Sequence, residues 1–358
     1  MKAFHKTPGS HPVHPNPPGT GIFSSRAITL VAILVTTAVI LVMLELGARQ
    51  VVPSGTPLER ARAVITAEGL PALADLFEPD PERFWKLRSS LRQYRVQGTI
   101  EGYPIDFTVS TDNKGRRVTP MSDDPGAPVV WTLGDSATFG LGVDDDQAWP
   151  ARLALMALDQ QQPLNVFNYG VPGYTAWQGL QQLRQLLETD SPPDFLVAGF
   201  WANDKATWTG RSDVETARLL ARAGSPMAWI NRLALLKLWA ERSPVRHATG
   251  NARPRLSEQE FTDCLGQIIH LCRQYHVHVA LLVWPSRPQV EERQRDLYGY
   301  QRLVENTALE EGCSLINPAQ RFIAAGKNCF VDNFHGNAEG CRLAAEEAWA
   351  WLSTNLEK

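Results

Sequence analysis

The chain has 358 residues, of which 44% are hydrophobic and 20% charged, and its formal net charge is −3. This balance is typical of a folded protein and excludes an intrinsically disordered chain. Nucleic-acid binding needs a concentrated basic face, which this composition does not indicate, so we expect no nucleic-acid partner.

The five cysteines are too few for a disulfide scaffold in a chain of this length. Cys264 and Cys272 lie two turns apart on one predicted helix, about 12 Å at 1.5 Å per residue, which is too far for a bond between them. One disulfide bond could form among Cys313, Cys329 and Cys341, although the sequence favours structural, unreactive thiols. No Cys-x-x-Cys motif or Cys/His cluster indicates a metal, and we expect no cofactor.

The first segment, residues 1–26, is rich in Pro, Gly, His and Ser and predicts a disordered tail. It precedes an uncharged run from Ala27 to Leu44, whose roughly 18 residues approach the thickness of a bilayer core. A buried core helix would show a polar stripe, and a signal peptide would have a shorter apolar run and a clearer cleavage site. We therefore expect a transmembrane helix at residues 27–46.

The charges around this run predict its orientation. Lys2, Lys6 and Arg26 lie before it, which favours a cytoplasmic tail and an extracytoplasmic domain after it. In a Gram-negative cell this means a single-pass protein of the inner membrane with a periplasmic domain. The membrane is then one expected partner.

Residues 47–126 are predicted to form a helical connector followed by a β-hairpin. The charged stretch 50–95 is broken by prolines and indicates short helices. Residues 96–100 and 105–110 have the period of strands, and 111–115 indicate a turn. We expect the hairpin to pack on the edge of the main domain.

The main domain is predicted at residues 127–356, where strands and helices alternate. The strands are expected at 129–133, 165–168, 195–200, 277–284 and 314–316. The helices are expected at 149–158, 177–188, 259–275, 294–311 and 338–352, and Ser257 with Glu260 forms a capping box before one of them. This alternation predicts an α/β fold with a mainly parallel five-stranded sheet and helices on both faces.

Residues 205–256 do not fit the alternation and predict a helical insert between the third and fourth strands. The insert contains Trp208, Trp229 and Trp239. These tryptophans either line a substrate pocket or belong to the core. The acidic run 144–146 indicates a solvated loop and helix start rather than a calcium site, since acids favour helix N-termini. Three histidines are expected to be structural: His270, His276 and His278.

Four polar motifs are the candidate site. Gly134-Asp135-Ser136 follows the first strand, and a glycine-rich turn with Gly170 and Gly173 follows the second. Asn203 follows the third strand, and Asp332 precedes His335 by one turn near the last helix. Open α/β sheets bind ligands at the carboxyl ends of their strands. A serine there can act as a nucleophile if a histidine, oriented by an aspartate, takes its proton.

Together these motifs resemble the SGNH hydrolase family, also called the GDSL esterase/lipase family, over residues 127–354. The resemblance implies a flavodoxin-like three-layer sandwich with Ser136 as nucleophile, His335 as base and Asp332 as its orienting acid. It also implies an oxyanion hole formed by the N–H groups of Ser136 and Gly173 and the side chain of Asn203. Gly170 is the second choice for the glycine.

One residue departs from the family pattern, and one further feature argues against a different fold. Ala202 precedes Asn203 where the family often has glycine, and alanine costs little space. The nucleophile motif also lacks the second glycine of the Gly-x-Ser-x-Gly elbow, which argues against the α/β-hydrolase fold.

Together with the predicted anchor, the resemblance indicates a membrane-anchored extracytoplasmic serine esterase. It would hydrolyse an O-acyl ester, in the first place an acetyl ester, of a carbohydrate or lipid. One alternative is an O-acyltransferase that acts on an envelope or exported polysaccharide. A second is a binding protein that keeps the fold without catalysis.

Overall fold

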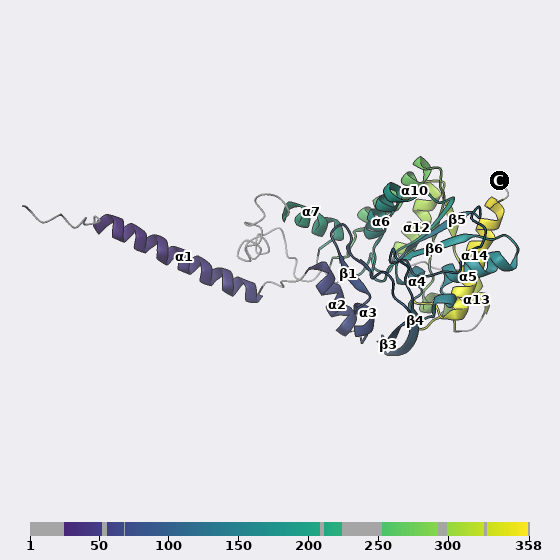
Figure 1. Ribbon diagram of the computed structural model, residues 1–358, viewed down its shortest axis with the longest axis horizontal. Coiled ribbons are helices and arrows are strands. Elements are labelled where there is room, and N and C mark those ends of the chain that lie inside the picture. Colours follow the sequence, from purple (N-terminus) through teal and green to yellow (C-terminus); the bar gives the residue numbers. More distant parts are fainter. Residues whose placement is uncertain are drawn as a thin grey trace, which may run out of the picture. The chain divides into compact units, whose positions relative to one another are not determined.

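The computed structural model describes residues 25–51, 56–67, 69–207, 211–223, 253–292, 299–325 and 328–356 (Figure 1). The chain divides into two compact units, one with helix α1 and one with the sheet. The tail up to residue 24 lies outside the described residues. So does most of the predicted insert, including its three tryptophans.

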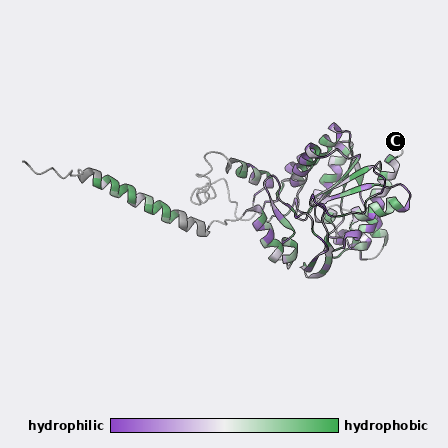
Figure 2. Ribbon diagram, viewed as in Figure 1, coloured by the Kyte–Doolittle hydropathy of each residue, from purple (hydrophilic) through white to green (hydrophobic). Residues whose placement is uncertain are grey.

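Helix α1 (Ser25–Val51) has no polar stripe. Its described side chains, residues 28–44, are all exposed, and Leu34 and Met43 are 61% and 69% exposed. Figure 2 shows this stretch as hydrophobic along its length. Counting only what the structure describes, it contains no helix whose length and apolarity suffice to traverse a bilayer.

The second unit is built on a five-stranded parallel sheet with the order β6-β5-β7-β8-β9. This is the flavodoxin-like order, and the predicted α/β fold is confirmed. Every predicted strand is present to within two residues at each end. The strands are β5 (Val129–Gly134), β6 (Asn165–Gly170), β7 (Phe195–Gly199), β8 (His278–Leu282) and β9 (Ser314–Ile316).

Alternate residues of the strands point to opposite faces and make two apolar cores. Val130 and Val197 pack with helices α5 (Trp149–Asp159) and α14 (Ala338–Leu356). Leu133 and Leu196 pack on the other face. That face is covered by α6 (Ala176–Thr189), α10 (Glu258–Gln274) and α12 (Gly299–Glu310) (Figure 1). The result is the predicted three-layer sandwich.

The predicted helices are confirmed, and so is the capping box before α10, where Ser257 and Glu260 bond reciprocally. The described part of α12 begins at Gly299, because residues 294–298 of the predicted helix lie outside the described residues. The described residues also form shorter helices, among them α7 (Asp213–Ala223), α11 (Arg287–Glu291) and α13 (Ala319–Ala325).

The segment before the sheet is more than the predicted helical connector. It begins with α2 (Pro57–Ala67) and α3 (Pro71–Ala74), and then β1 (Phe77–Asp80) pairs antiparallel with β2 (Phe84–Leu87). The prediction of helix over residues 77–87 was wrong. These strands are short and do not alternate, and Phe77, Trp85 and Leu87 are buried in the core of the sheet unit.

The predicted hairpin is confirmed as β3 (Tyr94–Ile100) and β4 (Tyr103–Val109). Its turn residues Glu101 and Gly102 have φ of 51° and 84°, the left-handed pair that a tight two-residue turn needs. Beyond the hairpin, Arg117 forms a bridge with Asn168 of the edge strand β6. The segment after the hairpin therefore meets the edge of the main sheet.

All five cysteines are free thiols, and no bridge forms among Cys313, Cys329 and Cys341. Burial raises the pKa of the Cys264 and Cys341 thiols to about 12. Since the thiolate is the reactive form, these side chains are inert, as expected.

Candidate active site

The nucleophile turn follows β5 directly. Asp135 caps the short helix α4 (Ser136–Phe139) by accepting a hydrogen bond from the Ala137 N–H at 2.9 Å. Gly134 is required just before it, because a Cβ there would lie 2.1 Å from Thr138 Oγ1 and 2.7 Å from the Gly199 carbonyl oxygen. The strand end thus places Ser136 as the first residue of the helix.

Arg117 holds the other end of α4. Its fully buried guanidinium donates to the carbonyls of Phe139 and Gly140 at 2.8 and 2.6 Å. It also donates to the Val143 carbonyl at 2.6 Å and to Asp145 Oδ1 at 3.0 Å. These bonds tie the nucleophile turn to the acidic run after it.

The acidic run begins a 3-10 helix (Asp145–Gln147), which confirms the predicted helix start. The run is only partly solvated, since Asp146 is exposed and Asp144 and Asp145 are half-buried. Asp144 accepts from the Thr108 N–H and hydroxyl at 2.8 and 2.9 Å, and Asp145 also accepts from the Ser110 N–H. Among the described residues no group of three or more His, Cys, Asp or Glu side chains could hold a metal ion.

Ser136, His335 and Asp332 form one line of hydrogen bonds. His335 Nε2 lies 2.7 Å from Ser136 Oγ, and His335 Nδ1 lies 2.5 Å from Asp332 Oδ2. Asp332 Oδ1 accepts from the backbone N–H groups of Phe334 and His335, both at 2.7 Å. Because the carboxylate takes the Nδ1 proton, Nε2 can accept the serine proton.

Burial and charge act against each other in this pair. Burial disfavours the charged carboxyl of Asp332, but His335 and three hydrogen bonds outweigh it and lower its pKa below the usual value. Burial likewise disfavours the imidazolium of His335, but the Asp332 carboxylate outweighs it and raises the pKa of His335 above 6.5. The aspartate therefore stays ionised and makes the histidine a stronger base.

Neighbouring residues fix the loop that carries Asp332 and His335. The Arg287 side chain donates to the carbonyls of Asp332 and Phe330 at 2.7 and 2.9 Å. The Trp284 indole donates to the Phe334 carbonyl at 2.6 Å. Three carbonyls of the loop are thus held by side chains of the β8–α11 region.

The structure separates the two glycines of the second motif. The Gly170 N–H donates to Asn168 Oδ1 at 2.9 Å, and a Cβ on Gly170 would lie 2.2 Å from the Phe139 nitrogen. Gly170 is therefore a packing residue. Gly173 has a φ of 82°, and neither its N–H nor that of Ser136 donates a hydrogen bond to any residue that the structure describes. The Gly173 N–H is therefore open to an acceptor from outside the chain, whereas the Gly170 N–H is not.

Asn203, just beyond the end of β7, joins the two turns. Its Nδ2 donates to the Tyr174 carbonyl at 3.1 Å and approaches Asp135 Oδ2 at 3.4 Å. The side chain therefore lies between the Gly173 turn and the Ser136 turn. The ends of three adjacent strands bring together the donors predicted for the oxyanion hole.

The sequence around these residues was compared with known proteins. Residues 132–343, more than half of the chain, match the model of the GDSL-like Lipase/Acylhydrolase family. The chain belongs to this family. The resemblance seen in the four motifs is confirmed.

The individual proteins similar to this GDSL protein either match a short stretch of it or share a low percentage of identical residues with it. An arylesterase of Vibrio mimicus is 35% identical over 72 residues, which cover 20% of this chain and only 36% of the relative. The esterase EstA of Pseudoalteromonas sp. is 15% identical, with 64% of this chain and 100% of that one covered and a TM-score of 0.41. A lipase/acylhydrolase of Enterococcus faecalis is 14% identical, with 64% and 96% covered and a TM-score of 0.42.

Two buried acids of the GDSL protein flank the site. Burial raises the pKa of Asp135 to about 6 and that of Asp204 to about 8. Asp204 Oδ1 accepts from the Ala176 N–H at 2.7 Å, while Oδ2 has no hydrogen-bond partner in the described part of the chain. Asp204 therefore favours its neutral form near pH 7 and serves to start helix α6.

The sequence did not point to the residues that support the site. Arg117, Arg255 and Arg287 each bond to carbonyls of a catalytic turn 22 or more positions away in the chain. Arg255 donates to the Gly173 carbonyl at 2.6 Å and pairs with Asp213 at 2.7 Å. No local motif marks them, since an isolated arginine normally indicates a solvated surface.

Proposed function

We propose that this GDSL-family protein is a serine esterase that cleaves an oxygen ester through an acyl-serine intermediate. The observation that carries the proposal is the hydrogen-bonded line from Ser136 through His335 to Asp332. Serine is a weak nucleophile until a base takes its proton, and this line supplies the base and its orienting acid.

In the first step Ser136 Oγ bonds to the ester carbonyl carbon while His335 Nε2 takes the hydroxyl proton. The negative charge that develops on the carbonyl oxygen is met by the N–H groups of Ser136 and Gly173 and by Asn203 Nδ2. Loss of one such donor typically costs about 2.7–4 kcal/mol of transition-state stabilisation. The bond to the leaving oxygen then breaks, and His335 gives that oxygen the proton.

In the second step water resolves the acyl-serine. His335 takes a proton from the water as its oxygen bonds to the acyl carbon, the ester bond to Ser136 breaks, and the proton returns to Oγ. Asp332 keeps the Nδ1 proton throughout and stabilises the imidazolium that forms in each step. His335 carries every proton transfer and the backbone N–H groups only donate hydrogen bonds, so the proposed mechanism needs no cofactor.

For the substrate we propose an O-acyl ester, in the first place an acetyl ester, of a carbohydrate or lipid. The name of the arylesterase relative supports an ester as the reacting group. The proposed location supports the rest of the substrate, since polysaccharides and lipids are what an enzyme at the cell envelope meets.

We also propose that α1 anchors the protein in the inner membrane with the catalytic unit outside the cytoplasm. The described side chains alone fall short of a span. The proposal rests on the uncharged sequence from Ala27 to Leu44, on the exposure of its apolar side chains and on the basic residues before it.

A substrate comparison tests this function. The full-length protein in detergent is assayed with nitrophenyl acetate and long-chain nitrophenyl esters, with and without a sugar acceptor. The proposal predicts hydrolysis that is faster for the acetyl ester and unaffected by sugar. Faster release with sugar, together with acylated sugar as product, would instead show an acyltransferase. No turnover of any ester would contradict an esterase.

A further inference from the structure

The turn that contains Pro172 and Gly173, here called the oxyanion turn, accepts a hydrogen bond from a residue outside the family-matched stretch. Trp85 lies in β2, well before residue 132, and is 3% exposed. Its indole Nε1 donates to the Pro172 carbonyl at 3.3 Å, 87 positions along the chain. The carbonyl that it holds belongs to the peptide group that carries the Gly173 N–H.

The geometry of that peptide determines where the N–H points. The described chain contains no cis peptide bond, so the Pro172 carbonyl and the Gly173 N–H lie on opposite sides of the peptide. A donor that holds the carbonyl on one side directs the N–H to the other. Pro172 has no backbone N–H, so of these two residues only Gly173 can donate a backbone hydrogen bond.

The peptide after Gly173 is held as well. Arg255 Nη1 donates to the Gly173 carbonyl at 2.6 Å, and its guanidinium lies 5.5 Å from the centre of the Trp85 ring. With one residue holding each adjoining peptide, the left-handed conformation of Gly173 has little freedom. A pre-set donor is what stabilises an oxyanion, because it pays no reorganisation when charge develops.

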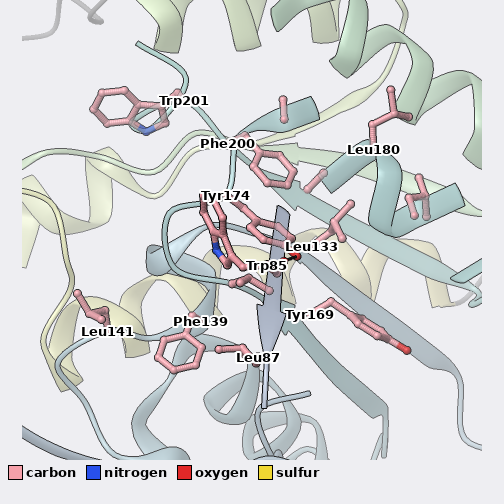
Figure 3. Close-up of a cluster of buried hydrophobic side chains, with 14 of the residues drawn as sticks. Trp85, Leu87, Leu133, Phe139, Leu141, Tyr169, Tyr174, Leu180, Phe200 and Trp201 are labelled. Atoms are coloured by element: carbon pink, nitrogen blue, oxygen red, sulfur yellow. Dashed lines mark hydrogen bonds between the residues drawn. The ribbon is translucent and has the colours of Figure 1, made fainter. Parts of the chain in front are cut away.

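Trp85 is itself fixed from the same turn. The Tyr174 hydroxyl donates to the Trp85 carbonyl at 2.6 Å, and the two rings meet edge to face at 6.0 Å. Figure 3 draws both side chains among the buried hydrophobic residues. Burial raises the pKa of the Tyr174 hydroxyl far above its usual value, so it stays a donor at all working pH values.

We propose that Trp85 is a positioning residue of the active site, whose indole N–H sets the direction of the Gly173 oxyanion donor. The inference rests on the proposed esterase function. It makes the segment before the sheet part of the catalytic apparatus, since the sheet and its helices alone lack the group that holds this peptide.

The test compares full-length wild type with Trp85→Phe and with Trp177→Phe as a matched control. The ring of Trp177 stacks on that of Phe84 in β2, with 5.0 Å between the ring centres. Among the described residues, Trp177 makes no hydrogen bond to the oxyanion turn. For Trp85→Phe we expect kcat to fall about tenfold with KM unchanged, less than the roughly 10²–10³-fold cost of removing a donor outright. Trp177→Phe should stay within about twofold of wild type.

The pH profile separates this role from a structural one. The acidic limb set by His335 should not move in Trp85→Phe, because the base and its aspartate are untouched. The inference would be overturned if kcat of Trp85→Phe equalled that of Trp177→Phe. It would also be overturned if a change in KM, or a shift of the acidic limb, accounted for the loss of activity.

A second variant covers poor folding of Trp85→Phe. Replacing Trp85 with benzothienylalanine exchanges only the indole N–H for sulfur and keeps the shape of the ring. The same fall in kcat is expected, and an unchanged kcat would overturn the inference. A wild type without esterase activity, or a Ser136→Ala variant that keeps it, would overturn the proposed function as well.

Discussion

At the scale of single residues, the site works by placing a buried carboxylate against a histidine. Asp332 has a side-chain exposure of 1% and His335 one of 14%. The carboxylate cannot drift, since Oδ1 is bound by two backbone N–H groups and Oδ2 by the imidazole. This fixes both the tautomer and the ring plane of His335.

The raised pKa of His335 predicts the acidic limb of the pH profile. Only the neutral imidazole accepts the Ser136 proton, so kcat/KM should rise with pH through the pKa of His335, which lies above 6.5. In Asp332→Asn the imidazolium loses its stabilising charge, so the limb should move to lower pH. The kcat should fall by about 10⁴, since the other tautomer is favoured. A pH–rate profile that keeps its limb would contradict this pairing.

The residues that we propose to react could be named from the sequence, whereas the residues that support them could not. Ser136, Asn203, Asp332 and His335 lie in short motifs beside predicted strand ends or helices, so sequence position alone brings them near one edge. The sequence already ranked Gly173 before Gly170, but the packing of Gly170 against Phe139, which sets the two apart, appears only in the folded chain. The supporting arginines act through contacts that depend on the packed chain, which local patterns do not encode.

At the scale of elements, the sheet was the most predictable part. Parallel strands buried on both faces are continuous apolar runs, and β5 and β7 are of this kind. The amphipathic helices between them repeat at the expected period. Strands β1 and β2 have four residues each, and residues far away in the chain bury them. Their sequences therefore lack the alternation of apolar and polar residues that would predict a strand.

A substitution of Arg117 tests how these elements are joined. It links the segment after the hairpin to α4 and to the acidic 3-10 helix. Arg117→Met would remove the charged partner of the Asp145 carboxylate and the side-chain donor of several carbonyls. It should lower the free energy of unfolding by about 3–5 kcal/mol, as breaking buried ion pairs does.

The matched control for Arg117 is Arg95→Met. Arg95 pairs with Asp106 in the hairpin, but the two side chains are 62% and 50% exposed. Exposed pairs contribute little, so no measurable change in urea unfolding is expected. Equal urea midpoints for the two variants would show that Arg117 does not join the elements.

At the scale of the whole molecule, the segment before the sheet is joined to the catalytic unit. Besides Trp85 on the oxyanion turn, Glu101 at the hairpin tip accepts a hydrogen bond from Asn333, next to Asp332. Arg287, which holds the same loop, lies 4.9 Å from the ring centre of Tyr103. Both ends of the reacting machinery are therefore contacted from outside the family-matched stretch.

The proposed anchor gives a prediction of topology. With the protein expressed in a Gram-negative host, protease added to spheroplasts should degrade the chain after residue 50, and intact cells should protect it. The physical reason is that the uncharged run holds the chain in the membrane while the basic flank stays inside. Protection in spheroplasts would overturn the extracytoplasmic placement.

The most direct test of the whole account is covalent labelling of Ser136. The full-length protein is treated with a fluorophosphonate, and the adduct is located by mass spectrometry of its peptides. We predict one adduct, on Ser136, which is absent in Ser136→Ala although that variant unfolds at the same temperature as wild type. An undiminished adduct in Ser136→Ala would contradict the assignment of the nucleophile and the mechanism built on it.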